Sequence, residues 1–223
     1  MPSQLVLPLI STPSLSRSDF IVAPGNQQAV ALIDSWPNWP VGVVVIYGPS
    51  GSGKTHLVSI WQAAGARVVS ASALGEDRGP EGGTVAVEDV DSCPATDARD
   101  AWLFRLIEGA SPAAPLLLTG KEAPQAWQTV LPDLASRFSA ALSFSLWKPD
   151  DALLEALAGK LLADRQLAVP PAVITRILQS LERTPQAVRD FISRADAKAL
   201  SEGRPITLAL VRELIAREDD GLS

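Results

Sequence analysis

A glycine-rich octapeptide carries the residue types and spacing best suited to chemistry in this chain, because it fits the pattern GxxxxGK[ST]. Glycines let successive backbone N–H groups turn toward one centre, where they can bind phosphate oxygens at the N-terminus of the following helix. Lys54 adds a positive charge for the β- and γ-phosphates, and the Thr55 hydroxyl can bind Mg²⁺. The pattern therefore predicts a site for a nucleoside di- or triphosphate. Its residues are Gly48, Pro49, Ser50, Gly51, Ser52, Gly53, Lys54 and Thr55.

Two carboxylates follow the apolar stretch at residues 84–87, and they are the candidates for holding a metal ion. A phosphate-binding loop of this kind needs an acidic residue at the end of a neighbouring strand, which holds the metal through its water shell. An aspartate usually comes first in such a pair, whereas here Glu88 precedes Asp89. Either Glu88 or Asp89 could therefore face the metal, and a surface acidic turn is the alternative. We expect Asp91 to be solvated at the surface.

A threonine ends the next apolar stretch, at Leu116–Thr119. The carboxyl ends of parallel strands meet at one edge of a sheet, so Thr119 would lie beside the γ-phosphate and could orient a water molecule. The alternative is that Thr119 is an ordinary residue at the end of a strand.

The elements that must position these residues alternate between apolar strands and helices up to residue 146. This alternation indicates an α/β domain in which a parallel sheet is covered by helices on both faces. It also disfavours reading the octapeptide as a chance turn, because a strand precedes it and a helix follows it. The predicted strands are 43–47, 67–70, 85–88, 116–119 and 141–146, and the predicted helices are 27–35, 54–63 and 97–108.

Beyond residue 146 the strand patterns stop, and only helical patterns remain. Asp150 or Asp151 can cap the first of these helices, which runs to about Asp164. The others are expected at 171–181, 185–200 and 208–217. The chain is therefore expected to have three parts: a flexible tail at 1–18, a nucleotide-binding α/β domain at 19–146 and a helical domain at 147–223.

The composition limits the classes of function. Among 223 residues the net charge is −6, which argues against a broad nucleic-acid-binding face, because such faces neutralise phosphates with Lys and Arg. One cysteine, Cys93, cannot form an internal disulfide, and with a single histidine, His56, it makes no metal cluster. The apolar runs are too short to span a membrane, and no basic residue precedes the first of them. We therefore expect a cytoplasmic protein.

Taken together, these motifs resemble the AAA+ ATPases, a group of P-loop NTPases with a helical lid after the sheet. The strings at 46–48 and 53–57, which include His56, resemble the P-loop of the bacterial replication initiator DnaA. Leu131–Phe138 is similar to its arginine-finger segment, and Ala187–Asp190 to its second sensor. The resemblance runs from about residue 19 to 217. It implies an AAA+ P-loop NTPase fold that binds ADP or ATP with Mg²⁺.

The resemblance also implies roles for single residues. Arg137, expected in a loop before the last strand, would act on ATP bound to a neighbouring subunit, while Arg189 in the lid would sense the chain's own nucleotide. Phe20 and Val22 are similar to residues that flank the adenine. The alternatives are a surface salt bridge for Arg137 and an ordinary solvent-facing side chain for Arg189. With Arg137, the implied catalytic residues are Thr119 and Asp89.

Near the N-terminus lies an apolar stretch, Gln4–Leu9, that fits neither an export signal nor a core strand. A tail of this kind can lay leucines into a hydrophobic groove while the glutamine amide sets the register, and a proline reduces the entropy lost on ordering. It resembles the peptide by which the Hda family of DnaA-related regulators binds the sliding clamp, the β subunit of DNA polymerase III. The alternative is a strand packed on the chain's own sheet. The expected clamp-binding residues are Gln4, Leu5, Leu7, Pro8 and Leu9.

The Hda family also fits the expectation that no DNA-reading module follows residue 217. The resemblance implies a negative regulator of DNA replication initiation with two partners, the clamp and DnaA. Little direct DNA binding, no membrane and a possible homodimer are expected. Hydrolysis by the chain itself is expected to be weak or absent. The alternatives are a stand-alone AAA+ ATPase of the helicase-loader type that acts on DNA, and a scaffold with nucleotide as a structural ligand.

Overall fold

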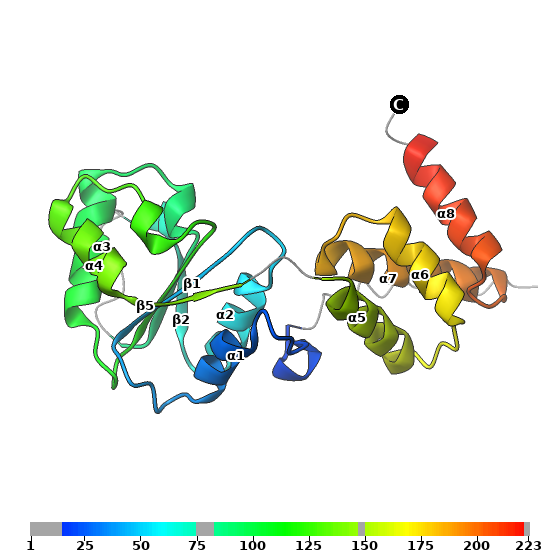
Figure 1. Cartoon of the computed structure of the whole chain (residues 1–223), viewed down its shortest axis with the longest axis horizontal. Coiled ribbons are helices and arrows are strands. Elements are labelled where there is room, and N and C mark those ends of the chain that lie inside the picture. The colour runs from blue at the N-terminus through cyan, green and yellow to red at the C-terminus, as the bar shows by residue number, and fades with distance from the viewer. Residues whose placement is uncertain (1–14, 75–82, 147–149, 221–223) are drawn as a thin grey trace, which may run out of the picture. The chain divides into compact units, whose positions relative to one another are not determined.

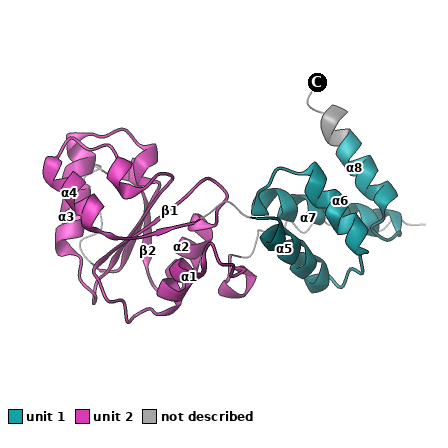
Figure 2. Ribbon diagram, viewed as in Figure 1, with its two compact units in different colours: residues 1–14, 149–223 teal, residues 15–148 magenta. Residues whose placement is uncertain are grey.

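A computed structural model describes residues 15–74, 83–146 and 150–220, without the side chains of 217–220. The chain divides into a sheet unit, Leu15–Lys148, and a helical unit that begins at Pro149 (Figures 1 and 2). The predicted clamp-binding residues lie outside the described residues. Leu15–Ser18, which the sequence assigned to the tail, belong to the sheet unit. There Arg17 forms an ion pair with Asp34 at 2.7 Å.

Five parallel strands form the sheet, in the order β2-β3-β4-β1-β5. Each strand agrees within one residue at either end with an apolar stretch expected from the sequence. Strand β1 pairs with β4 on one side and β5 on the other, and Tyr47 lies opposite Gly120 and Ser145. The strands are β1 (Val43–Tyr47), β2 (Arg67–Ser70), β3 (Val85–Glu88), β4 (Leu116–Gly120) and β5 (Leu142–Ser145).

Helices cover both faces of the sheet, so alternate residues of a strand are buried in two separate cores. On β1, Val44 and Ile46 pack with residues of α1 and α2, whereas Val45 packs with residues of α3 and α4 (Figure 1). Both faces of the central strands are apolar for this reason. The helices are α1 (Gln27–Asp34), α2 (Lys54–Ala63), α3 (Asp97–Gly109) and α4 (Pro132–Ala140).

Helix α4 corrects one prediction, because Arg137 was expected in a loop. Pro132 is the first helical residue, a position where the missing N–H of proline costs nothing and its φ suits the helix. Leu134 and Phe138, four residues apart, are fully buried against the sheet. Arg137 therefore lies on a packed helix.

The described part of the helical unit contains four helices whose apolar faces pack together (Figure 2). The Asp150 side chain accepts a hydrogen bond from the N–H of Leu153 at 2.8 Å, which confirms the predicted cap of the first helix. Thr184 caps the third in the same way. These helices are α5 (Asp151–Asp164), α6 (Pro171–Ser180), α7 (Pro185–Glu202) and α8 (Leu208–Asp220).

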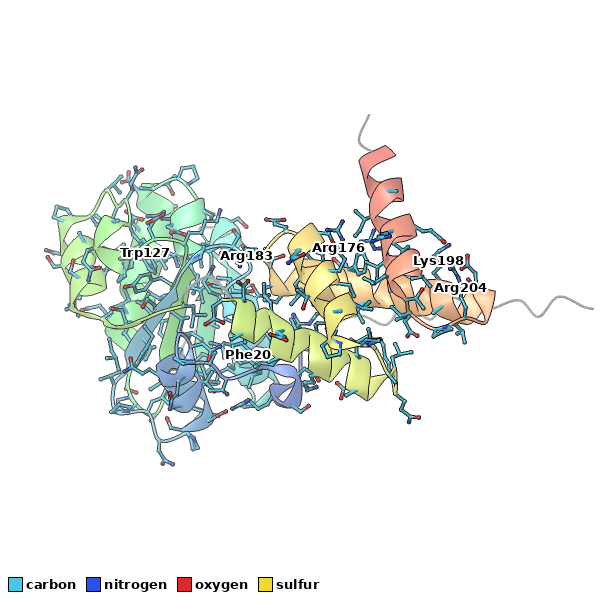
Figure 3. All side chains as sticks on the ribbon, turned by 45° about the vertical axis from the view of Figure 1, so that its right-hand side comes forward. Phe20, Trp127, Arg176, Arg183, Lys198 and Arg204 are labelled. Carbon is cyan, nitrogen blue, oxygen red and sulfur yellow. The ribbon has the colours of Figure 1, made fainter. Side chains whose placement is uncertain are left out.

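Surface ion pairs join α7 to α8 at the end of the helical unit. Lys198 and Arg204 both contact Glu213 of α8, at 3.4 and 2.7 Å, and both also contact Glu202 (Figure 3). No helix in the described part of the chain is long and apolar enough to cross a membrane.

Candidate functional site

The octapeptide joins the end of β1 to the start of α2, as the sequence predicts, and a Cβ atom would be crowded at two of its glycines. At Gly48, a Cβ atom would lie 2.2 Å from the carbonyl oxygen of Leu146. At Gly53, where φ is +102°, a Cβ atom would lie 3.0 Å from the ring of Phe20. The glycines therefore permit a tight backbone turn at the N-terminus of a ten-residue helix, where the helix dipole favours an anion.

Lys54, the first residue of α2, turns its ammonium group back into the octapeptide. Its Nζ donates to the carbonyl oxygens of Gly48 and Pro49, at 2.7 and 3.1 Å, and the residue is only 7% exposed. Burial lowers the pKa of this amine, Lys121 adds to the lowering, and three carboxylates oppose it. In order of strength, those carboxylates are Asp89, Asp91 and Glu88.

Ser52 has a buried hydroxyl, and its Oγ makes no hydrogen bond among the described residues. Leaving such a group without a partner is costly, so Ser52 fits an anion with acceptor oxygens. Thr55 at the second helical position is exposed, and its hydroxyl can reach solvent or a metal ion. The residues present thus fit a phosphate chain.

The two acidic candidates differ in their backbone. Glu88 is the last residue of β3, whereas Asp89 has a left-handed conformation with φ of +55°, which aspartate tolerates better than most residues. The N–H of Asp89 donates to Thr119 Oγ1 at 3.1 Å, and Thr119 is almost completely buried at the end of β4. The structure therefore brings Asp89 and Thr119 together at the carboxyl edge of the sheet, next to the octapeptide.

Asp91 corrects a further prediction, because it is not simply solvated. Its Oδ2 accepts hydrogen bonds from the N–H groups of Lys121 and Glu122, at 2.7 and 2.8 Å, and its Oδ1 is buried. Asp91 thus ties the segment after β3 to the segment after β4. These partners are 30 and 31 residues away, and only the sheet order brings them near.

Gly120, which ends β4, is covered by the indole of Trp127. A Cβ atom at residue 120 would lie 2.6 Å from Trp127 Cζ2, so glycine is required while the indole stays there. The indole N–H of Trp127 donates to the carbonyl oxygen of Glu122 at 2.8 Å. The segment after Thr119 is therefore held firmly against the sheet.

The metal-ligand candidates are few. No group of three or more His, Cys, Asp or Glu side chains among the described residues is placed to hold a metal ion. Mg²⁺ commonly binds through one or two protein oxygens together with substrate phosphates and water, so Thr55 with Glu88 or Asp89 suits it better than a protein cage would.

Phe20 and Val22, the two residues predicted to flank the adenine, differ in their exposure to solvent. Phe20 is buried and meets the His56 ring edge-on, with the two ring centres 5.0 Å apart. His56 is also buried, and its Nε2 lies 2.9 Å from the carbonyl oxygen of Ser16. Val22 is 47% exposed. Phe20 and His56 therefore pack together in the interior, with the Phe20 ring next to Gly53 of the octapeptide. Val22 is accessible to a ligand.

The two candidate arginines lie on different units. Arg137 on α4 is 45% exposed, forms an ion pair with Glu108 of α3 and lies over the ring of Phe104, 5.4 Å from the ring centre. This is the surface salt bridge considered above as the alternative, and it leaves the guanidinium accessible. Arg189 is a half-buried residue of α7 in the helical unit. Its predicted role remains a prediction.

Sequence reasoning missed a buried ion pair within α3. Arg99 and Asp100 are both almost completely buried and contact each other at 2.7 Å. Adjacent residues on a helix do not normally face each other, so the pair gave no recognisable signal.

Replacing Lys54 with methionine should weaken the binding of ADP and ATP about 10- to 100-fold, the value of one or two hydrogen bonds to a charged group. Methionine keeps an apolar stem of similar length, so the fold should persist. Isothermal titration with each nucleotide measures the loss. As a control, Lys160→Met removes an exposed i,i+4 ion pair with Asp164 on α5 and should leave affinity unchanged. Wild-type affinity in the Lys54 variant would rule out this site.

Comparisons with known proteins agree with this geometry at the level of the fold. No protein-family model matches the sequence, and no curated protein matches it. Among solved structures, domain III of the Thermotoga maritima replication initiation protein DnaA is similar with a TM-score of 0.75 and 17% identity, over 93% of this chain and 97% of that domain.

Two longer proteins are also similar. AMPPCP-bound DnaA from Aquifex aeolicus has a TM-score of 0.71 and 19% identity, over 85% of this chain and 67% of that chain. The Thermotoga maritima RuvB Holliday junction branch migration motor has a TM-score of 0.64 and 15% identity, over 90% and 70%. The predicted fold class is therefore confirmed: this chain has the AAA+ P-loop NTPase fold, in the form seen in domain III of DnaA.

Proposed function

We propose that this chain is a nucleotide-binding AAA+ regulator of the Hda type, which docks on the sliding clamp and supplies Arg137 to ATP bound by DnaA. The observation that carries the proposal is the match to domain III of DnaA, which covers nearly all of both chains. AAA+ subunits of closely similar shape can stand beside one another, so that an arginine of one reaches the nucleotide of the next. Negative regulation of replication initiation would follow from the conversion of DnaA-bound ATP to ADP.

The chain's own nucleotide would be ADP or ATP, held by the octapeptide. Backbone N–H groups, the Lys54 ammonium and the Ser52 hydroxyl would bind the phosphate oxygens, while Thr55 would bind Mg²⁺. Mg²⁺, when bound, neutralises charge on the phosphates. One solved DnaA structure is described as bound to AMPPCP, an ATP analogue, which supports this assignment.

Of the two acidic candidates, Asp89 is the better metal partner. It opposes the burial-driven fall in the pKa of Lys54 more strongly than Glu88 does, so its charge acts more strongly at the phosphate-binding ammonium. Thr119 holds the backbone of Asp89 through its hydroxyl, which can still donate its own hydrogen to a water molecule. With Glu88 in the place usually taken by aspartate, we infer that hydrolysis by the chain itself is weak.

Arg137 has the exposure and spare donors that action on another subunit needs. Its Nη2 donates to Glu108, while its Nε and Nη1 make no hydrogen bond to any described residue. A guanidinium carries five N–H donors in a planar fork that matches phosphate oxygens. Charge spreads over the γ-phosphoryl oxygens in the transition state of hydrolysis, and Arg137 would stabilise it there.

The clamp-docking part of the proposal rests on the sequence of Gln4–Leu9. The leucines would enter a hydrophobic groove on the clamp, and the glutamine amide would set the register. Docking raises the effective concentration of Arg137 near DnaA wherever the clamp is loaded on DNA, without any new contact to DnaA.

One observation favours a second candidate. The similarity to the RuvB branch migration motor supports an AAA+ ATPase that acts on DNA directly, as a helicase loader would. Such a protein would hydrolyse its own ATP faster when DNA is added, and residues 4–9 would not matter.

The test follows the nucleotide on DnaA. Purified protein with ADP or ATP is added to DnaA loaded with radiolabelled ATP, with and without clamp loaded on DNA. We expect ADP to accumulate on DnaA only when both protein and loaded clamp are present, because the tail must be tethered. Gln4→Ala with Leu5→Ala should remove clamp binding in a pull-down and the stimulation with it. Leu15→Ala, a change in an exposed leucine after the tail, is the matched control.

Two results would argue against the proposal. Clamp binding that survives the double change would remove the docking role of the tail. Turnover by the chain alone that rises with DNA, with no ADP on DnaA, would favour the motor.

A further inference from the structure

Arg137 is held in place by two side chains of one neighbouring helix. Phe104 and Glu108 of α3 are four residues apart, so they lie on the same face of that helix. The ring of Phe104 lies under the guanidinium, 5.4 Å from its carbon to the ring centre, and the carboxylate of Glu108 accepts from Nη2. We refer to Phe104 and Glu108 as the arginine seat.

The helices that carry the seat and the arginine are joined rigidly at their other ends. Asp100 of α3 accepts hydrogen bonds from Thr129 Oγ1 and the N–H of Val130, both at 2.6 Å, just before α4 begins. Beside it, Arg99 Nη2 donates to the carbonyl oxygen of Gln128 at 2.6 Å. These contacts are largely buried, so they fix the position of α3, which carries Phe104 and Glu108, relative to the start of α4, which carries Arg137.

The strength of the two seat contacts suits a side chain that must still bind a phosphate. Arg137 and Glu108 are 45% and 50% exposed, so water screens their attraction and a triphosphate can compete with it. A cation over an aromatic ring keeps its edge donors available, because the ring contacts only the face of the guanidinium. The seat therefore restricts the rotamers of a long side chain without using all of its donors.

We propose that Phe104 and Glu108 are positioning residues for Arg137, which order its guanidinium before it meets the triphosphate of DnaA. This inference rests on the function proposed above. A pre-ordered arginine loses less conformational entropy in the transition state, so the seat acts on the rate of the chemical step. It does not act on the assembly of the two proteins, because neither residue needs to touch DnaA.

The test uses Phe104→Leu and Glu108→Gln in the full-length chain, each alone and combined with Arg137→Ala. Stimulated hydrolysis of DnaA-bound ATP is measured across a range of regulator concentrations with loaded clamp. Each seat variant should lower the maximal rate about three- to tenfold, corresponding to the loss of one side-chain contact, and leave the half-saturating concentration unchanged. Combined with Arg137→Ala, neither should lower the rate further, because the seat acts only through that arginine.

Two matched controls separate this effect from a general loss of structure. Trp102→Leu removes the ring beneath Arg105, a comparable arginine–ring pair on α3 with a distance of 5.6 Å. Glu155→Gln changes an exposed glutamate of α5. Both should leave the maximal rate unchanged. Thermal unfolding of Glu108→Gln, an exposed change that the fold should accept, should match that of the unaltered chain.

The outcomes distinguish this inference from the proposed function. A full maximal rate in both seat variants, or a higher rate in Glu108→Gln, would overturn the positioning role while the function of Arg137 stands. Full stimulation by Arg137→Ala alone would instead remove the proposed function.

Discussion

Replacing Arg137 with alanine should reduce the stimulation of ATP hydrolysis on DnaA by about 10³-fold, to the rate of DnaA alone. An arginine supplied to a triphosphate by a second protein stabilises charge that exists fully only in the transition state, so its loss acts on the rate. The exposed ion pair with Glu108 contributes at most about 1 kcal/mol to stability, so the variant should fold normally. Single-turnover hydrolysis with ATP-loaded DnaA and loaded clamp measures the effect.

Two further variants make the Arg137 result specific. Arg137→Lys keeps the charge but loses the planar fork, and most of the stimulation should disappear with it. Arg105→Ala removes an exposed arginine that also lies over a ring, on the neighbouring helix α3, and should leave stimulation intact. Nucleotide and clamp binding should be unchanged in all three variants. Stimulation of unaltered size in Arg137→Ala would exclude this residue as the finger.

Replacing Asp100 with alanine should destabilise the sheet unit by about 3–5 kcal/mol, because the buried charge of Arg99 would lose its countercharge. The hydroxyl of Thr129 and the N–H of Val130 would lose their acceptor at the same time. That loss is a large share of the roughly 5–15 kcal/mol that stabilise a typical domain. Urea unfolding followed by circular dichroism gives the free energy directly, and Tm should fall by about 10 °C or more.

A matched control for Asp100 is Asp97→Ala in the first turn of the same helix, where the carboxylate is exposed. That change should cost about 1 kcal/mol or less, the value of a favourable charge at a helix N-terminus. Equal small losses in both variants would show that the buried pair does not stabilise the fold.

Acid should weaken the same network. Burial raises the pKa of Asp100, but hydrogen bonds from Thr129, Val130 and Arg99 outweigh burial and leave the pKa below its ordinary value. The folded state then favours the ionised form, so its contribution to stability is complete above about pH 4. It disappears as pH falls through the lowered pKa. The difference in stability between the unaltered chain and Asp100→Asn should therefore shrink in acid.

The nucleotide-binding part of this molecule could be predicted from sequence because its determinants are contiguous. Strand β1, the octapeptide and α2 follow one another within 21 residues, Val43–Ala63, and the structure has both elements at the predicted bounds. Each glycine, the lysine and the apolar strand carry a local signal of their own. The fold class followed from the alternation of apolar strands with helices, and each of those elements is also recognised from residues that are close together in the sequence.

Helix α4 was missed because its signals point in two directions. Pro132 is usually read as a helix breaker, and the segment resembles an arginine-finger loop, so a loop was expected. Proline as the first helical residue, an acidic Asp133 in the first turn and the apolar pair Leu134 and Phe138 all favour a helix. Nine residues are too few for periodicity to settle the matter.

The contacts of Asp91, Asp100 and Arg137 could not be predicted, because each joins residues about 30 positions apart. A charged side chain on a helix or turn is usually solvated, and nothing local distinguishes one that meets a partner on another element. These long-range contacts depend on the order of the strands, because that order places β3 beside β4 and α3 against α4. The alternation of apolar strands and helices predicted a parallel sheet but not the order of its strands.

The close approach of Trp127 to Gly120 has a consequence for how this chain could change over evolution. Any amino acid larger than glycine at residue 120 would overlap the indole, so such a change must arrive together with a smaller residue at 127. The two codons are thus coupled, although six positions separate them. A lineage that acquires a side chain directly after Thr119 must therefore replace its tryptophan in the same step or earlier.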